Sequence, residues 1–78
     1  MLNVTITPAV AALVSPDAPE VAPLVLSAAR GIVLDEGIAP AQALSLAADT
    51  VAHDVGSVSQ REALCIAKAA LALCEMGA

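Results

Sequence analysis

The sequence predicts a small all-α domain preceded by a short β-strand or an extended arm. Apolar residues repeat with helical spacing, prolines and glycines divide these repeats into segments, and alanine, the strongest helix former, is abundant. A chain of 78 residues has room for one domain, so we treat residues 1–78 as a single unit. We expect three main helices and a short first one, over residues 8–14, 18–36, 40–55 and 60–76.

The segment before the first helix, residues 2–7 with the sequence LNVTIT, alternates apolar and polar side chains as a half-buried strand does. Leu2, Val4 and Ile6 fall on its apolar side. Because a single strand cannot satisfy its own backbone groups, three arrangements are open. The segment can pair with its copy in a dimer, add to the sheet edge of another protein, or lie across the helices as an extended arm.

The first helix has a clear start signal, with Thr7 as the N-cap and Pro8 at the first helical position. The prolines of the SPDAP stretch end it. Asp17 and Glu20 have the spacing of a capping box, which predicts the start of the second helix. Gly37 is the expected residue just beyond its end.

The second helix is apolar around most of its circumference, which predicts a central, buried position. Pro23 lies in its first turns, so the helix either kinks there or becomes regular only from that residue. The third helix begins with Pro40 and ends at Gly56.

Two overlapping capping boxes precede the last helix, Ser57 with Gln60 and Ser59 with Glu62. The second of them leads directly into the apolar repeat of that helix. We therefore expect the last helix to begin near Gln60.

Composition argues against several classes of ligand. The chain has three basic residues and a net charge of −5, so it lacks the cations that neutralise phosphates on nucleic acids or anionic membranes. It has no Phe, Tyr or Trp on which bases could stack. No uncharged apolar run reaches the about 18–20 residues that span a bilayer, and the start lacks the basic residues of a signal peptide. We expect a cytoplasmic protein that binds neither nucleic acid nor membranes.

No motif points to catalysis or to a cofactor. There is no glycine-rich phosphate loop, and no serine lies in a nucleophile elbow. His53, the only histidine, lies one turn after Asp49. This pair could hold a metal only if a partner subunit supplied further ligands; otherwise it is part of a solvated helix end. We expect no enzymatic activity.

The two cysteines, Cys65 and Cys74, are nine residues apart and fall on opposite faces of the last helix, so they cannot bridge each other. Cys74 lies in the apolar stripe and is expected in the core. Cys65 lies toward the polar side, where an incidental thiol, an intermolecular disulfide and a reactive thiol all remain open.

Carboxylates at the C-terminal ends of helices, where the helix dipole disfavours them, indicate a candidate contact surface. They either flank solvated loops or form an acidic rim that meets a basic partner. Leu46, on the outer face of the third helix, could serve as an apolar anchor in that rim. The predicted contact residues are Asp35, Glu36, Leu46, Asp49, His53 and Asp54.

The run VTITPAVAALV, residues 4–14, resembles the start of ribbon-helix-helix proteins, which are dimeric DNA binders and antitoxins. The resemblance implies that the strand pairs across a dimer and that Asn3, Thr5 and Thr7 face the bases. The remainder of the chain departs from that family, with a shorter first helix, two further helices and few basic residues.

We expect a homodimer, because a small core without aromatics or disulfides gains from burying a second face. The predicted function is a non-enzymatic interaction protein that binds a protein with a basic surface, such as a small inhibitor or adaptor of the kind phages and mobile elements carry. Two alternatives are a DNA-associated regulator of the ribbon type and a small metal-binding domain.

Overall fold

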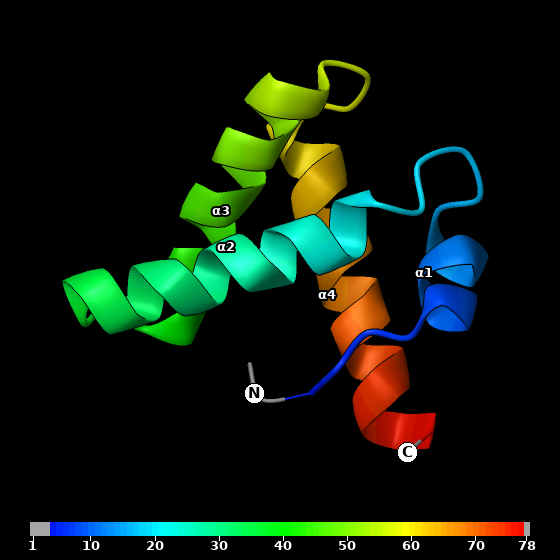
Figure 1. Cartoon of the computed structure of the whole chain (residues 1–78), viewed down its shortest axis with the longest axis horizontal. Coiled ribbons are helices and arrows are strands. Elements are labelled where there is room, and N and C mark those ends of the chain that lie inside the picture. The colour runs from blue at the N-terminus through cyan, green and yellow to red at the C-terminus, as the bar shows by residue number, and fades with distance from the viewer. Residues whose placement is uncertain (1–3, 78) are drawn as a thin grey trace.

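The computed structural model describes residues 4–77, and in this range the chain forms four helices and no strand (Figure 1). The predicted all-α bundle is therefore confirmed. None of these helices is long and apolar enough to cross a membrane. The helices are α1 (Pro8–Val14), α2 (Val21–Glu36), α3 (Pro40–Val55) and α4 (Gln60–Gly77).

Helices α2, α3 and α4 pack against one another, and α1 packs mainly against α4 (Figure 1). The Cα atoms fill a flat volume of 31 × 30 × 15 Å. Two helix layers about 8–10 Å apart, with Cα atoms about 2.3 Å from each axis, occupy about 13–15 Å, so this thickness holds two helix layers and no third one to enclose them. Each helix therefore keeps an outer face.

The core is built mostly from alanine. Of the 17 buried hydrophobic residues among the described part of the chain, ten are alanines, and the largest fully buried side chains are Leu44, Val21 and Val25. Small side chains allow helices to pack at the short end of the usual 8–10 Å separation. Alanines at these positions therefore favour close contact between the helices.

Most of the predicted helix ends are confirmed by their capping contacts. The hydroxyl oxygen of Thr7 accepts a hydrogen bond from the Val10 amide at 3.2 Å. Ser59 and Glu62 form the reciprocal capping box, with the Ser59 amide donating to Glu62 Oε1 and the Glu62 amide donating to Ser59 Oγ, both at 3.1 Å. Gly37 and Gly56 follow α2 and α3 with positive φ angles of 66° and 77°.

The predicted start of the second helix is wrong by three residues. The turn between Ser15 and Val21 uses backbone hydrogen bonds, and Glu20, at the N-cap of α2, makes no side-chain capping bond. The capping box predicted for Asp17 and Glu20 is therefore absent. Pro23 is the third residue of α2. An N–H at this position would have no acceptor within the helix, so a proline there costs no helical hydrogen bond. The helix therefore begins before Pro23.

The predicted burial of the second helix holds only for its first half. Val21, Ala22, Val25, Leu26 and Ala29 are buried, but no residue of α2 after Ala29 is. The last turns extend beyond the other helices at one edge of the molecule (Figure 1). Leu34, near the end of α2, is 84% exposed, because no other element covers that side.

Candidate protein-interaction surface

All six predicted contact residues are exposed, but the structure divides them into two groups. Asp35 and Glu36 end α2, and the other four lie on α3. Asp54 is 14 residues beyond Pro40, which at 1.5 Å per residue places it about 21 Å along the helix axis from the α2–α3 connection. The acidic residues therefore do not form one compact cluster.

Leu46 lies between the two acidic groups along the axis of α3. It is 47% exposed, on the side of α3 away from the buried stripe. Asp49 and His53 follow it at intervals of three and four residues, so the three side chains share one face of the helix. This face, which we call the α3 outer strip, consists of Leu46, Asp49 and His53. Asp54 lies about 80° around the helix from Leu46, on the side of Val51, and is exposed because it belongs to the last turn of α3.

The remaining side of α3 fixes the orientation of this strip. Ala43, Leu44, Ala47, Ala48 and Val51 are buried against the neighbouring helices. Rotating α3 would expose these five residues to water, which is costly. The strip is therefore held outward by the core.

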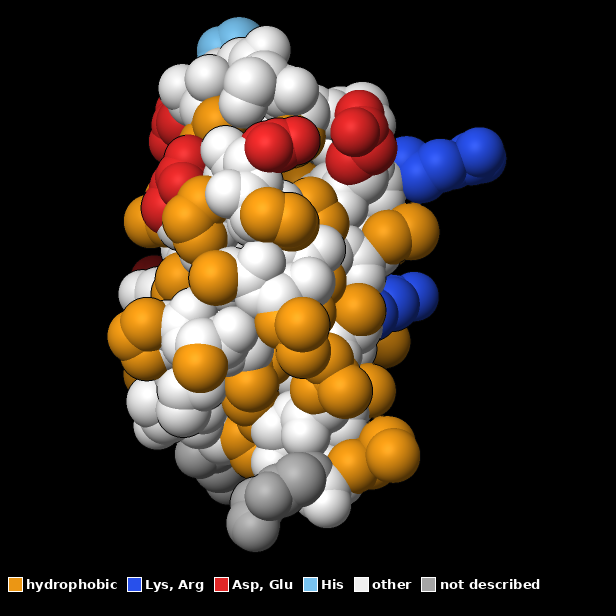
Figure 2. Space-filling view, turned by 90° about the vertical axis from the view of Figure 1, so that its right-hand side faces the viewer, with side chains coloured by type: hydrophobic (Ala, Val, Ile, Leu, Met, Phe, Trp, Pro, Cys, Tyr) orange, Lys and Arg blue, Asp and Glu red, His pale blue; other side chains and the backbone are white. Residues whose placement is uncertain are grey.

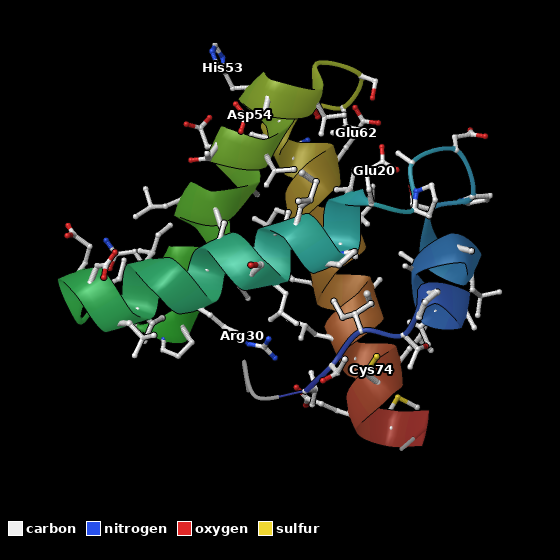
Figure 3. All side chains as sticks on the ribbon, in the orientation of Figure 1. Glu20, Arg30, His53, Asp54, Glu62 and Cys74 are labelled. Carbon is white, nitrogen blue, oxygen red and sulfur yellow. The ribbon has the colours of Figure 1, made fainter. Side chains whose placement is uncertain are left out.

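Two acidic residues missing from the predicted set lie at the same end of the molecule as Asp54. Figure 3 shows Glu20, His53, Asp54 and Glu62 together at the end where α3 finishes and α2 and α4 begin. Acidic side chains are also gathered toward this end in the space-filling view (Figure 2). The sequence pattern marks Glu20 and Glu62 only as capping residues, and only the arrangement of the helices places them at the same end of the molecule as Asp54 (Figure 3).

The connection between α3 and α4 is fixed by a side-chain contact that also supports this end. The Gln60 amide nitrogen donates to the carbonyl oxygen and to the hydroxyl oxygen of Ser45, both at 3.2 Å. Thr50 Oγ1, also on α3, donates to the Leu46 carbonyl oxygen at 3.2 Å.

No group of three or more His, Cys, Asp or Glu side chains in residues 4–77 has an arrangement that could hold a metal ion.

The N-terminal segment lies across the helices wherever it is described. Ile6 is 8% exposed, and Val4 is partly buried against the core. An Arg30 guanidinium nitrogen on α2 donates a hydrogen bond to the Val4 carbonyl oxygen. Of the three open arrangements, the extended arm agrees with this placement; pairing with another chain stays a prediction. Leu2 and Asn3 lie outside the described residues.

Each cysteine lies on the side of α4 predicted for it, but Cys74 is less buried than the predicted core position. Cys74 is half-buried and packs against the core, whereas Cys65 is exposed on the outer face of α4. Both are free thiols. Cys65 is therefore available to solvent or to another molecule.

Compared with models of protein families, with curated protein sequences and with solved structures, the chain has no significant match in any of the three.

Proposed function

We propose that this chain acts by binding another protein and has no catalytic activity of its own. The observation that supports this is the α3 outer strip, in which a half-exposed leucine is followed by Asp49 and His53 on a helix face that the core holds outward, with Asp54 exposed in the last turn of the same helix. A buried apolar anchor surrounded by charged residues is the usual anatomy of a protein interface.

The proposed partner has a basic surface. Glu20 and Glu62 lie at the same end of the molecule as Asp54, so the carboxylates there come from three helices or their caps (Figure 3). Charges at the border of an interface mainly raise the association rate and select against wrong partners. Leu46 would supply the apolar contact, and the carboxylates would orient the partner.

The proposed role is that of a small inhibitor or adaptor in the cytoplasm, of the kind that phages and mobile elements carry. This part of the proposal rests on the small size and acidic composition of the chain. Two free thiols agree with a reducing compartment.

The test is an affinity capture of proteins by the tagged full chain, followed by measurement of the affinity for the captured partner. Leu46→Ser should weaken binding, because it removes the anchor, and Asp49→Asn with Asp54→Asn should slow association and reduce its salt dependence. Leu13→Ser is the matched control, since Leu13 is more exposed than Leu46 and lies on α1, which carries none of the predicted contact residues. Equal binding by the Leu46, Asp49/Asp54 and Leu13 variants would contradict the proposed surface.

The predicted role of Asp35 and Glu36 is tested separately. A partner that contacts the whole length of α3 would cover about 20 Å, which fits within an interface of about 800 Å² per partner. Asp35→Asn with Glu36→Gln should then weaken binding as well. Binding unchanged by this pair would restrict the interface to the α3 outer strip.

A further inference from the structure

The outer face of α4 carries a second apolar stripe that the domain itself does not cover. Its members are separated by four, three and four residues, which is the spacing of a seam between two packed helices. All of them are exposed, and Met76 is 82% exposed. We call this stripe the outer α4 seam: Cys65, Ala69, Ala72 and Met76.

A different stripe of α4, on its inner side, makes the contacts with the other helices of the same chain. Ala63, Ala67, Ala70 and Leu71 are buried against the other helices. At 100° per residue, the outer α4 seam lies on the opposite side of the helix from this buried stripe. The seam is therefore not needed for the fold of one chain.

Helix α1 adds to the exposed apolar surface. Its sequence, PAVAALV, contains no polar side chain, yet Ala9, Ala12 and Leu13 are exposed, Leu13 by 73%. A helix that is apolar on all sides is normally buried on all sides. Leu73, which lies beside Ala69 and Met76 on α4, is 38% exposed. Figure 2 views the side on which α1 lies and shows hydrophobic side chains spread over most of it, with most of the acidic side chains toward its upper end.

We propose that the outer α4 seam binds a second copy of this chain, with the two α4 helices antiparallel around a two-fold axis. Each copy carries a net charge of −5, so two copies repel each other over most of their surfaces. The seam contains no charged residue. It therefore offers close contact with a second copy without placing carboxylates against each other.

The charges beside the seam select the antiparallel orientation. Lys68 and Glu75 lie seven residues apart along the same edge of the seam. In an antiparallel pair, Ala69 lies opposite Ala72 of the second copy, and Cys65 lies opposite Met76. This register places Lys68 beside Glu75 of the second copy, and symmetry produces the same pair twice.

The side chains of the seam suit this arrangement. Alanine at the two central positions lets the helices approach to about 8 Å. Met76 is flexible and fills the space opposite Cys65 near each end. Glu62 lies beyond the overlap, so its carboxylate stays in water. The dimer would cover the exposed seam of a flat domain only 15 Å thick.

The first test is sedimentation equilibrium of the full chain, followed by interference because the chain has no aromatic residue. The native chain should sediment as a dimer. Ala69→Glu should raise the dissociation constant by at least about a hundredfold, because it places a charge at the centre of the contact. Leu34→Glu is the matched control, since it adds the same charge at an exposed position on α2 and should remain dimeric.

Circular dichroism checks that Ala69→Glu keeps its helical content, as expected for an exposed position. A native chain that is monomeric at a few hundred micromolar would overturn the proposal. So would a folded Ala69→Glu variant that dimerises as tightly as the native chain.

The second test concerns orientation and uses a charge exchange. Lys68→Glu and Glu75→Lys should each weaken the dimer by about 2- to 30-fold, as expected from the loss of two exposed ion pairs. The double variant restores both pairs with the charges exchanged, so it should recover the native affinity. A double variant weaker than either single variant would overturn the antiparallel register.

A disulfide test gives an independent check of the register. In a Cys74→Ala background, Met76→Cys should form a covalent dimer under mild oxidation, because it places a thiol opposite Cys65 of the second copy. Without Met76→Cys, the two Cys65 thiols are 11 positions apart along the pair, about 16 Å, and should not cross-link. Rapid Cys65–Cys65 cross-linking would indicate parallel helices and refute the proposal.

This inference does not depend on partner binding at α3. Ala69→Glu should abolish self-association and leave binding at the α3 outer strip intact. Leu46→Ser should do the reverse, so failure of either proposal can be recognised separately.

Discussion

Leu44→Ala should remove a large part of the stability of this domain. Leu44, on α3, is fully buried and is one of the largest fully buried side chains in the described chain. Its removal loses the transfer free energy of the deleted carbons and leaves a cavity, and such changes cost about 2.7–5 kcal/mol. Alanines cannot extend into the space, so we expect a value of about 3–4 kcal/mol, toward the middle of this range.

The loss expected for Leu44→Ala is large compared with the total free energy of unfolding of the domain. At about 0.05–0.15 kcal/mol per residue, a chain of 78 residues has a free energy of unfolding of about 4–12 kcal/mol. With a urea dependence of about 1 kcal/mol per molar, the unfolding midpoint should fall by about 3 M. At the lower end of the stability range, the variant would retain about 0–1 kcal/mol, so about 15–50% of the molecules would be unfolded in the absence of urea.

The assay is urea unfolding followed by circular dichroism at 222 nm, because the chain has no Trp or Tyr fluorescence. All variants are compared at one protein concentration, since self-association would shift the midpoint. Leu34→Ala is the control; Leu34 is 84% exposed, and its truncation should change stability by less than about 0.5 kcal/mol. A loss below about 1 kcal/mol for Leu44→Ala would show that the helices close around the gap and would refute the reasoning.

Three further substitutions test local contacts by the same urea assay. Ser59→Ala should cost about 1 kcal/mol, because it removes the N-cap of the α4 capping box, whereas Ser57→Ala should have little effect; equal losses would contradict the assigned box. Gly56→Ala should cost about 1 kcal/mol because φ is +77° there, while Gly31→Ala, in the middle of α2 with open space around the added carbon, should stabilise by about 0.5–1 kcal/mol. Gln60→Ala should cost about 1 kcal/mol by removing the hydrogen bonds to Ser45, and an unchanged midpoint would show that water replaces them.

Helix identity and most helix ends could be predicted because they depend on local chemistry. Thr7 before Pro8, the Ser59–Glu62 pair, and the glycines at 37 and 56 each act within a few residues of their own position. The structure confirms all of them. The start of α2 could not be predicted in this way, because Asp17 and Glu20 have capping-box spacing while the backbone turn from Ser15 to Val21 supplies hydrogen bonds instead.

Burial and the grouping of the acidic residues could not be predicted fully, because both depend on how helices far apart in the sequence pack together. Ile32 and Val33 follow the apolar pattern of the second helix, but the other helices do not fully cover its last turns, so these two side chains are only partly buried. The same holds for the acidic residues: the pattern placed Asp35 and Asp54 in one rim, but the length of α3 separates them. Glu20 and Glu62 were assigned to helix ends, and their position at the same end of the molecule as Asp54 depends on how three helices meet (Figure 3).

The alanine-rich core also affects the conformational entropy of folding. A buried Leu or Met loses rotamer freedom worth about 0.5–2 kcal/mol on folding, but an alanine has no rotamers to lose. Ten of the 17 buried hydrophobic positions in the described part of the chain therefore become ordered without a side-chain entropy cost. A core without alternative rotamers also has few alternative packings, so larger side chains at these positions would shift the helix backbones instead of adjusting locally. Substitutions that enlarge Ala29, Ala47 or Ala63 should for this reason be tolerated less well than equal changes in size at Leu71.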